Sequence, residues 1–305
     1  MFDAFLNSVL PVFAMVGLGV FARWRGYFAV AEANALSRFV YYVAGPVLLF
    51  RLIMSTDFAR FNFLQIGAYL AAEIIIYALA YLLFRRVFRR GVRESLLLGM
   101  STVFANHVLY LLPIATYQFG EDRASAIVTF IAGDLFVIYG ATLLILDATS
   151  PGGASLRAVA GRMASNPQVL ALLLGLACNL AGLRLAGGFQ AFAQFLGGAA
   201  SPVSLFALGI VLMAQKGLGD LRVSLSAVGL KLLAMPALAT FLLLVVLRQP
   251  LDDVALTLLI ASAPSGVMTF VLAMRYDIPA QDIGRAAMLS TMLSTFTVSA
   301  MLQVL

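Results

Sequence analysis

The chain has very few residues of the kinds that carry chemistry. It contains one cysteine and one histidine in 305 residues, and Cys178 lies within an apolar run. A single cysteine excludes an intramolecular disulfide and argues against a structural zinc site. There is no G-x-S-x-G, no H-E-x-x-H and no phosphate loop ending in Gly-Lys-Ser or Gly-Lys-Thr. We therefore expect no enzyme activity, no cofactor, no metal site and no ATP-driven step within this chain.

Charged residues are scarce as well. They make up 11% of the chain, whereas 62% of its residues are hydrophobic and the mean hydropathy is +1.00. Soluble domains carry roughly a quarter charged residues, so the composition predicts a membrane protein that crosses the bilayer several times. The net charge of +6 does not indicate nucleic-acid binding, because Arg and Lys lie mainly in short connections between apolar stretches. The amino-terminal segment has no basic n-region and leads directly into a span, so we expect no cleavable signal peptide.

Ten apolar stretches are close to the ~20 residues that a helix needs to cross a bilayer. The predicted spans are 4–22, 35–55, 62–84, 94–119, 124–146, 166–184, 189–214, 222–247, 251–274 and 280–304. They predict an all-α polytopic fold with ten transmembrane helices. The longest connection, 147–165, contains Pro151-Gly152-Gly153 and predicts a flexible linker between a first five-helix repeat, 1–146, and a second, 166–305.

Positive charge predicts the orientation in the membrane. The odd-numbered connections hold 14 Arg and Lys residues and the even-numbered ones hold 4. This excess places the odd connections in the cytoplasm and both termini outside it. We therefore expect a multi-pass protein of the inner (plasma) membrane.

Two of the spans, 94–119 and 251–274, carry polar residues and prolines in their middle. These residues are Asn106, His107 and Pro113 in span 4, and Ser262, Pro264 and Ser265 in span 9. An unpaired backbone group in hydrocarbon costs several kcal/mol, so a broken helix persists only where it faces protein or a watery cavity. Two broken helices at corresponding positions of two halves indicate the substrate site of a secondary transporter. We expect the two breaks, with Pro113 and Pro264 as helix breakers, to face each other.

The two halves also resemble each other in sequence. Residues 44–52 match residues 200–208 at six of nine positions, an offset of 156. The same offset carries Asn106 onto Ser262 and Asp134 onto Ser290. Because each half has an odd number of spans, the second half enters the membrane from the opposite side. The pattern predicts two inverted five-helix repeats, the architecture of many alternating-access carriers.

Several motifs together resemble a known family. They are the N-x6-P element from Asn106 to Pro113, the interrupted span around Pro264 followed by A-x-x-Y-D at Ala273, Tyr276 and Asp277, and the Asn166-Pro167 opening of span 6. The chain resembles the auxin efflux carrier family, whose bacterial members include malonate transporters and related carboxylate permeases. The resemblance implies a scaffold from spans 1, 2, 6 and 7, and a mobile transport domain from spans 3–5 and 8–10. It also implies that broken spans 4 and 9 cross at the substrate site, and that the scaffold forms a homodimer.

The polar residues at the breaks are candidates for substrate binding. Asn106 either caps a half-helix or binds a substrate carboxylate. The same two alternatives apply to Ser262 and Ser265. Half-helix N-termini suit an anion, because they present free N–H groups and a positive dipole end. His107 binds an anion, relays a proton or is a hydrogen-bonded interior histidine.

Three ionisable residues lie inside the remaining spans. Glu73 is central in span 3, Asp134 in span 5 and Lys231 in span 8. Intramembrane charges are costly, and two acids with one base leave one carboxylate free to titrate. The trio therefore predicts a proton-coupling device, although a purely structural ion pair and a sodium site at Asp134 remain alternatives.

These observations predict a secondary active transporter of small organic anions, either malonate-like dicarboxylates or auxin-like carboxylates. We expect elevator-type alternating access coupled to protons or to membrane potential, with membrane lipid as surroundings and no nucleic-acid partner. A sodium-coupled symporter resembling the bile-acid transporters is one alternative. A non-transporting membrane sensor on the same scaffold is another.

Overall fold

The computed structural model describes residues 10–55, 62–124, 126–149, 157, 161, 164–214 and 219–304, except for a few side chains within these ranges. Most of the predicted linker 147–165, including its Pro-Gly-Gly segment, lies outside this part of the chain. The described residues are helical, apart from connections and one isolated antiparallel bridge. Within the described ranges, six helical stretches are long and apolar enough to cross a membrane: Val30–Met54, Phe63–Val87, Ile127–Leu146, Gly187–Val211, Leu221–Val246 and Gln281–Val304.

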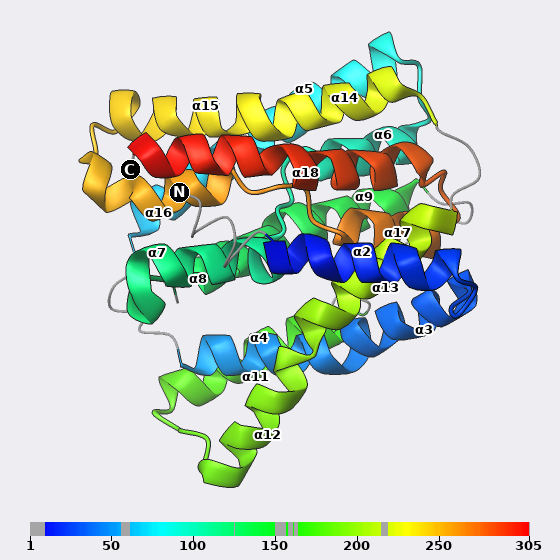
Figure 1. The fold of residues 1–305 in the computed structure, drawn as a ribbon. Coiled ribbons are helices and arrows are strands. Elements are labelled where there is room, and N and C mark those ends of the chain that lie inside the picture. Colours follow the sequence, from blue (N-terminus) through cyan, green and yellow to red (C-terminus); the bar gives the residue numbers. More distant parts are fainter. Residues whose placement is uncertain are drawn as a thin grey trace.

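A first group of helices comes from the start of each half of the chain. Its members are α2 (Leu10–Trp24), α3 (Val30–Phe39), η2 (Val40–Ala44), α4 (Gly45–Met54), α11 (Pro167–Leu180), α12 (Gly187–Gly198) and α13 (Ala200–Ala214). Here α2 packs along α13, and α4 packs on α11 and α12. In Figure 1, α3, α4, α11 and α12 occupy the lower part of the view, α2 lies above them, and α13 runs from α12 up towards α2.

The second group contains the remaining helices and lies in the upper part of Figure 1. From the first half it has α5 (Phe63–Leu82), η4 (Leu83–Val87), α6 (Val92–Ser101), η5 (His107–Leu111), α7 (Leu112–Ala124), α8 (Ile127–Gly133), η6 (Asp134–Tyr139) and α9 (Gly140–Ala148). From the second half it has α14 (Leu221–Gly229), η7 (Leu230–Ala234), α15 (Met235–Thr240), η8 (Phe241–Val246), α16 (Leu251–Ala261), α17 (Met268–Arg275) and α18 (Gln281–Val304). Contacts of α6 with α17 and α18, and of α5 with α15 and α16, tie its two halves together.

Local sequence explains how the helices begin and how closely they pack. Asn166 is the N-cap of α11, its side chain accepts from the Gln168 N–H, and Pro167 occupies the first helical position, as the sequence predicts. In the first group, glycines let α2 and α13 touch through their backbones. A Cβ placed on Gly209 would lie 2.1 Å from the carbonyl oxygen of Val16, so no larger residue fits there without separating the helices.

Both predicted breaks are present, but one proline does not cause its break. The first lies between the end of α6 at Ser101 and the start of η5 at His107. The second lies between α16 and α17, at residues 262–267, and contains Pro264. The helix does not break at Pro113, which is the second residue of α7 and continues η5 without interruption. Proline is tolerated here because η5 has the wide π-helical turn, in which an N–H bonds five residues back rather than four.

Candidate functional site

The two broken helices meet each other through their backbones. Ala105 and Ser265 form an antiparallel bridge. The Asn106 N–H donates to the Pro264 oxygen at 2.9 Å, and the Gly266 N–H donates to the Phe104 oxygen at 2.7 Å. Each break thus satisfies backbone groups of the other, which removes the cost of interrupting a helix inside an apolar protein. We call this meeting point, residues 102–106 and 262–267, the crossing.

Lys231 from a neighbouring helix and two serines of the crossing itself hold the crossing in place. The Lys231 Nζ, from η7, donates to the Val103 oxygen at 2.8 Å. This contact puts a cation at the C-terminal end of α6, where the helix dipole favours one. The Ser265 Oγ donates to the Ser101 oxygen at 2.7 Å, and the Ser262 Oγ donates to the Leu258 oxygen at 2.9 Å. Both serine hydroxyls therefore bond the backbone of the broken helices.

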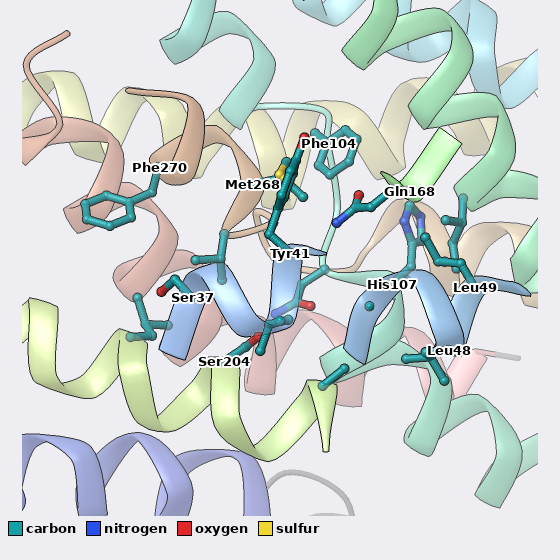
Figure 2. Close-up of a pocket in the computed structure, with 18 of the residues that line it drawn as sticks. Ser37, Tyr41, Leu48, Leu49, Phe104, His107, Gln168, Ser204, Met268 and Phe270 are labelled. Atoms are coloured by element: carbon teal, nitrogen blue, oxygen red, sulfur yellow. The ribbon is translucent and has the colours of Figure 1, made fainter. Parts of the chain in front are cut away.

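A cavity of about 170 Å³ lies between the crossing and the first group. Figure 2 shows side chains from α3, η2, α4, α11 and α13 around it, together with those of the crossing. Three of the predicted site residues, Asn106, His107 and Asp134, are among its lining residues. The remaining predicted residues, namely Glu73, Lys231, Ser262, Pro264 and Ser265, are not.

Of the predicted site residues, Asn106 is the best placed to contact a ligand. It is 7% exposed and lines the cavity, and its backbone is held by the crossing. Its side chain does not cap η5, and its amide makes no hydrogen bond with the other described residues. Buried amides are normally paired within the protein or with water. The Asn106 amide is therefore free to donate to, or accept from, a molecule in the cavity.

His107 joins the cavity to a cluster of buried polar groups behind it. Its Nε2 lies 3.4 Å from the Tyr69 hydroxyl, and its Nδ1 lies 3.5 Å from the Asp134 Oδ2. The histidine is 3% exposed and Asp134 is fully buried. Both ring nitrogens therefore face protein partners, which fits a relay or structural role better than direct binding of an anion.

The three predicted intramembrane charges do come together. Glu73, Asp134 and Lys231 all have 0% exposure and interact electrostatically with one another. Within the described residues, neither Glu73 oxygen has hydrogen-bond geometry to a neighbour. The cluster holds two acids and one base, so one carboxylate lacks a counter-charge.

Several lining residues were missed when the sequence was read alone. Gln168 of α11, Tyr41 of η2 and Ser204 of α13 line the cavity from the first group. A glutamine in the first turn of an apolar span was the signal for Gln168, because polar side chains within such spans are costly. Tyr69 precedes Glu73 by four residues and so lies on the same helix face, a spacing that could have identified it.

A family model described as "Membrane transport protein" matches residues 4–302 of the chain. The chain belongs to this family. The match covers nearly the whole sequence and confirms the predicted resemblance to auxin efflux carrier-like transporters.

Full-length relatives agree with this assignment. An uncharacterized transporter of Methanothermobacter thermautotrophicus is 27% identical, and the alignment covers 94% of each chain. A Rhizobium meliloti protein provisionally named as a malonate transporter is 24% identical over 96% of this chain and 93% of its own. An uncharacterized transporter of Escherichia coli K12 is 23% identical over 91% of this chain and 90% of its own.

Proposed function

We propose that the protein is a secondary active transporter of small organic anions that works by elevator-type alternating access. The observation that carries the proposal is the unpaired amide of Asn106, buried in the cavity where two broken helices cross. The second half-helices start at this crossing, with η5 following Asn106 and α17 following residue 267. Their positive dipole ends favour a carboxylate there, and the amide gives it a hydrogen-bond donor.

The lining favours an acid with one carboxylate and an apolar body over malonate. Phe104, Met268 and Phe270 line the cavity with aliphatic side chains of α4 and α13. No Arg or Lys lies among the lining residues that the structure describes. A second carboxylate would enter the cavity without a cation to pair with it, and burying an unpaired charge is costly. The malonate name of the Rhizobium relative makes the dicarboxylate the natural comparison in a transport assay.

The proposed architecture is ten transmembrane helices in two inverted five-helix repeats, 1–146 and 166–305, joined by the 147–165 linker. The offset of 156 between the halves supports it, because it relates the two breaks that meet at the crossing. It also relates Asp134, beside His107, to Ser290, whose Oγ accepts from the Ser265 N–H at 3.1 Å. Each half thus uses the corresponding residue of its last span to support its own break.

The proposed moving parts follow the two groups of helices. The first group would be the scaffold, spans 1, 2, 6 and 7, and the second would be the transport domain, spans 3–5 and 8–10. The cavity lies between the groups, as a site carried along a fixed wall requires. At the Tyr139 hydroxyl the groups are joined by hydrogen bonds with Tyr41 and Asn166, both at 3.3 Å, which a sliding movement would break.

The buried charges provide a means of coupling. Lys231 neutralises one of the two carboxylates, Glu73 and Asp134, and the other would take up and release a proton during transport. Coupling to protons suits this cluster better than coupling to sodium, because the Lys231 ammonium already donates to the Val103 carbonyl at the break. A bound sodium ion would need such a carbonyl as a ligand.

The charge pattern of the connections supports an inner-membrane protein with both termini outside the cytoplasm. Small residues on helices of the first group leave room for a homodimer formed through the scaffold. We include both in the proposal.

Uptake by proteoliposomes tests the proposed function. Labelled indole-3-acetate and labelled malonate would each be supplied with a pH gradient, a sodium gradient or neither. We expect proton-driven uptake of the monocarboxylate and loss of that uptake in Asn106→Ala, with normal membrane insertion. Unchanged uptake in Asn106→Ala would show that the substrate site is not at the crossing. Uptake that requires a sodium gradient would show sodium coupling instead of proton coupling.

A further inference from the structure

Gln168 is a buried polar side chain that the proposed substrate contacts do not include. It is the second residue of α11 and lines the same cavity as Asn106, but it belongs to the first group of helices (Figure 2). It is 7% exposed, and its side-chain amide makes no hydrogen bond with the other described residues. The cavity is therefore lined by two free amides, one from each group.

Gln65 shows how the fold treats a buried glutamine with a structural role. It is 9% exposed, close to the value for Gln168. Its Nε2 donates to the Asp253 oxygen at 3.1 Å, and its Oε1 accepts from the Thr257 hydroxyl at 3.2 Å. Both ends of that amide are paired within the protein. The unpaired amide of Gln168 is explained if its partner is the transported molecule, since an unmade buried hydrogen bond is costly.

The surroundings of Gln168 hold it at the cavity and leave its amide free. Asn166 is not available to a ligand, because its Oδ1 accepts from the Gln168 backbone N–H at 2.9 Å and its Nδ2 donates to the Tyr139 hydroxyl at 3.3 Å. Gly45 leaves space beside the amide, since a Cβ on that glycine would lie 3.7 Å from the Gln168 Nε2. Gln168 also lies in the first turn of a 14-residue helix, where the dipole favours an anion.

We propose that Gln168 and the first turn of α11 are the stationary half of the carboxylate site, used at only one face of the membrane. The inference rests on the proposed function. Asn106 would travel with the substrate, whereas α11 packs on α4 and stays in place. A substrate carboxylate therefore contacts Asn106 in both end states and Gln168 in one of them.

The charge pattern identifies which face this is. Helix α11 begins directly after the 147–165 connection, one of the odd-numbered connections that carry the excess of positive charge. The proposed orientation puts that connection in the cytoplasm. Gln168 thus acts in the cytoplasm-facing state, where it sets the affinity for substrate arriving from, or leaving to, the cytoplasm.

Transport measured separately from each face tests this assignment. Right-side-out and inverted membrane vesicles would take up labelled indole-3-acetate, with labelled malonate in parallel, under conditions without substrate inside. We expect Gln168→Leu to raise the half-saturation concentration roughly tenfold in inverted vesicles and less than twofold in right-side-out vesicles. Gln168→Glu, of the same size, should give a larger rise at the same face, because its carboxylate repels the substrate. Gln190→Leu, at an exposed position of α12, is the matched control.

The outcomes separate this inference from the function on which it rests. Wild-type uptake that Asn106→Ala reduces at both faces, combined with an effect of Gln168 variants at the cytoplasmic face only, supports the inference. Wild-type uptake with an equal effect, or no effect, of the Gln168 variants at the two faces overturns the inference alone. Uptake of neither acid by folded wild-type protein overturns the proposed function and the inference with it.

Discussion

Replacing Lys231 by methionine should destabilise the protein more than almost any other single change within the second group. The Lys231 ammonium is fully buried, donates to the Val103 oxygen at 2.8 Å and interacts with Glu73 and Asp134. Methionine fills a similar volume, so the change chiefly removes charge. The two carboxylates then lose the lysine beside them, and breaking a buried ion pair from one side costs about 3–5 kcal/mol.

A second substitution separates the charge effect from the lost hydrogen bond. Glu73→Gln combined with Lys231→Met removes one negative and one positive charge, so the net charge of the cluster is that of the wild type. What remains is the unpaired Val103 carbonyl, which costs about 1–3 kcal/mol. The double variant should therefore recover about 2 kcal/mol relative to Lys231→Met.

Thermal unfolding in detergent, followed by size-exclusion chromatography of heated samples, measures these effects. Lys231→Met should lower the melting temperature by roughly 10 °C, and the double variant should recover part of that loss. Leu232→Met, a buried apolar exchange in the same helical segment, controls for the change of shape. If Lys231→Met and Leu232→Met have the same melting temperature, and adding Glu73→Gln to Lys231→Met does not raise it, the three charges do not form an energetically coupled cluster.

Three further substitutions test packing and hydrogen bonding with the same unfolding assay. Gly209→Ala should lower the free energy of unfolding by about 1–3 kcal/mol, because the new Cβ would collide with a backbone oxygen of α2. Gly17→Ala, which has open space around it, should leave stability unchanged. Equal effects of the two variants would contradict the close contact at Gly209. Tyr139→Phe removes two hydrogen bonds between the groups and should cost about 2 kcal/mol, so an unchanged melting temperature would argue against that link. Ser265→Ala should cost about 1 kcal/mol and leave half-saturation for substrate unchanged; a large change in half-saturation would return its hydroxyl to the substrate site.

Local sequence was sufficient for the features that depend on neighbouring residues in the chain. Few charges and long apolar stretches predict membrane helices, because burying a side chain in lipid depends mainly on its own chemistry. The Asn166-Pro167 start of α11 and the breaks near Asn106 and Pro264 were predicted correctly. Capping and helix breaking involve backbone groups within one turn, so a short window of sequence contains the information they need.

Pro113 marks the limit of such local rules. Its missing N–H predicts a break, yet the π-helical turn before it accommodates the residue within a continuous helix. The choice between a break and a wider turn depends on how the rest of the bundle holds the segment, and the break goes instead to residues 102–106, where the other broken helix supplies hydrogen-bond partners.

The amino-acid sequence by itself determined the membrane character, the family and the presence of polar residues at two interrupted helices. Only the tertiary structure decided what those polar residues touch. Ser262 and Ser265 donate to backbone oxygens, whereas the free amides of Asn106 and Gln168 line the same cavity. A hydroxyl or an amide takes whichever partner lies within about 3 Å, and the partner of the Ser265 hydroxyl, the Ser101 oxygen, is 164 residues away in the chain.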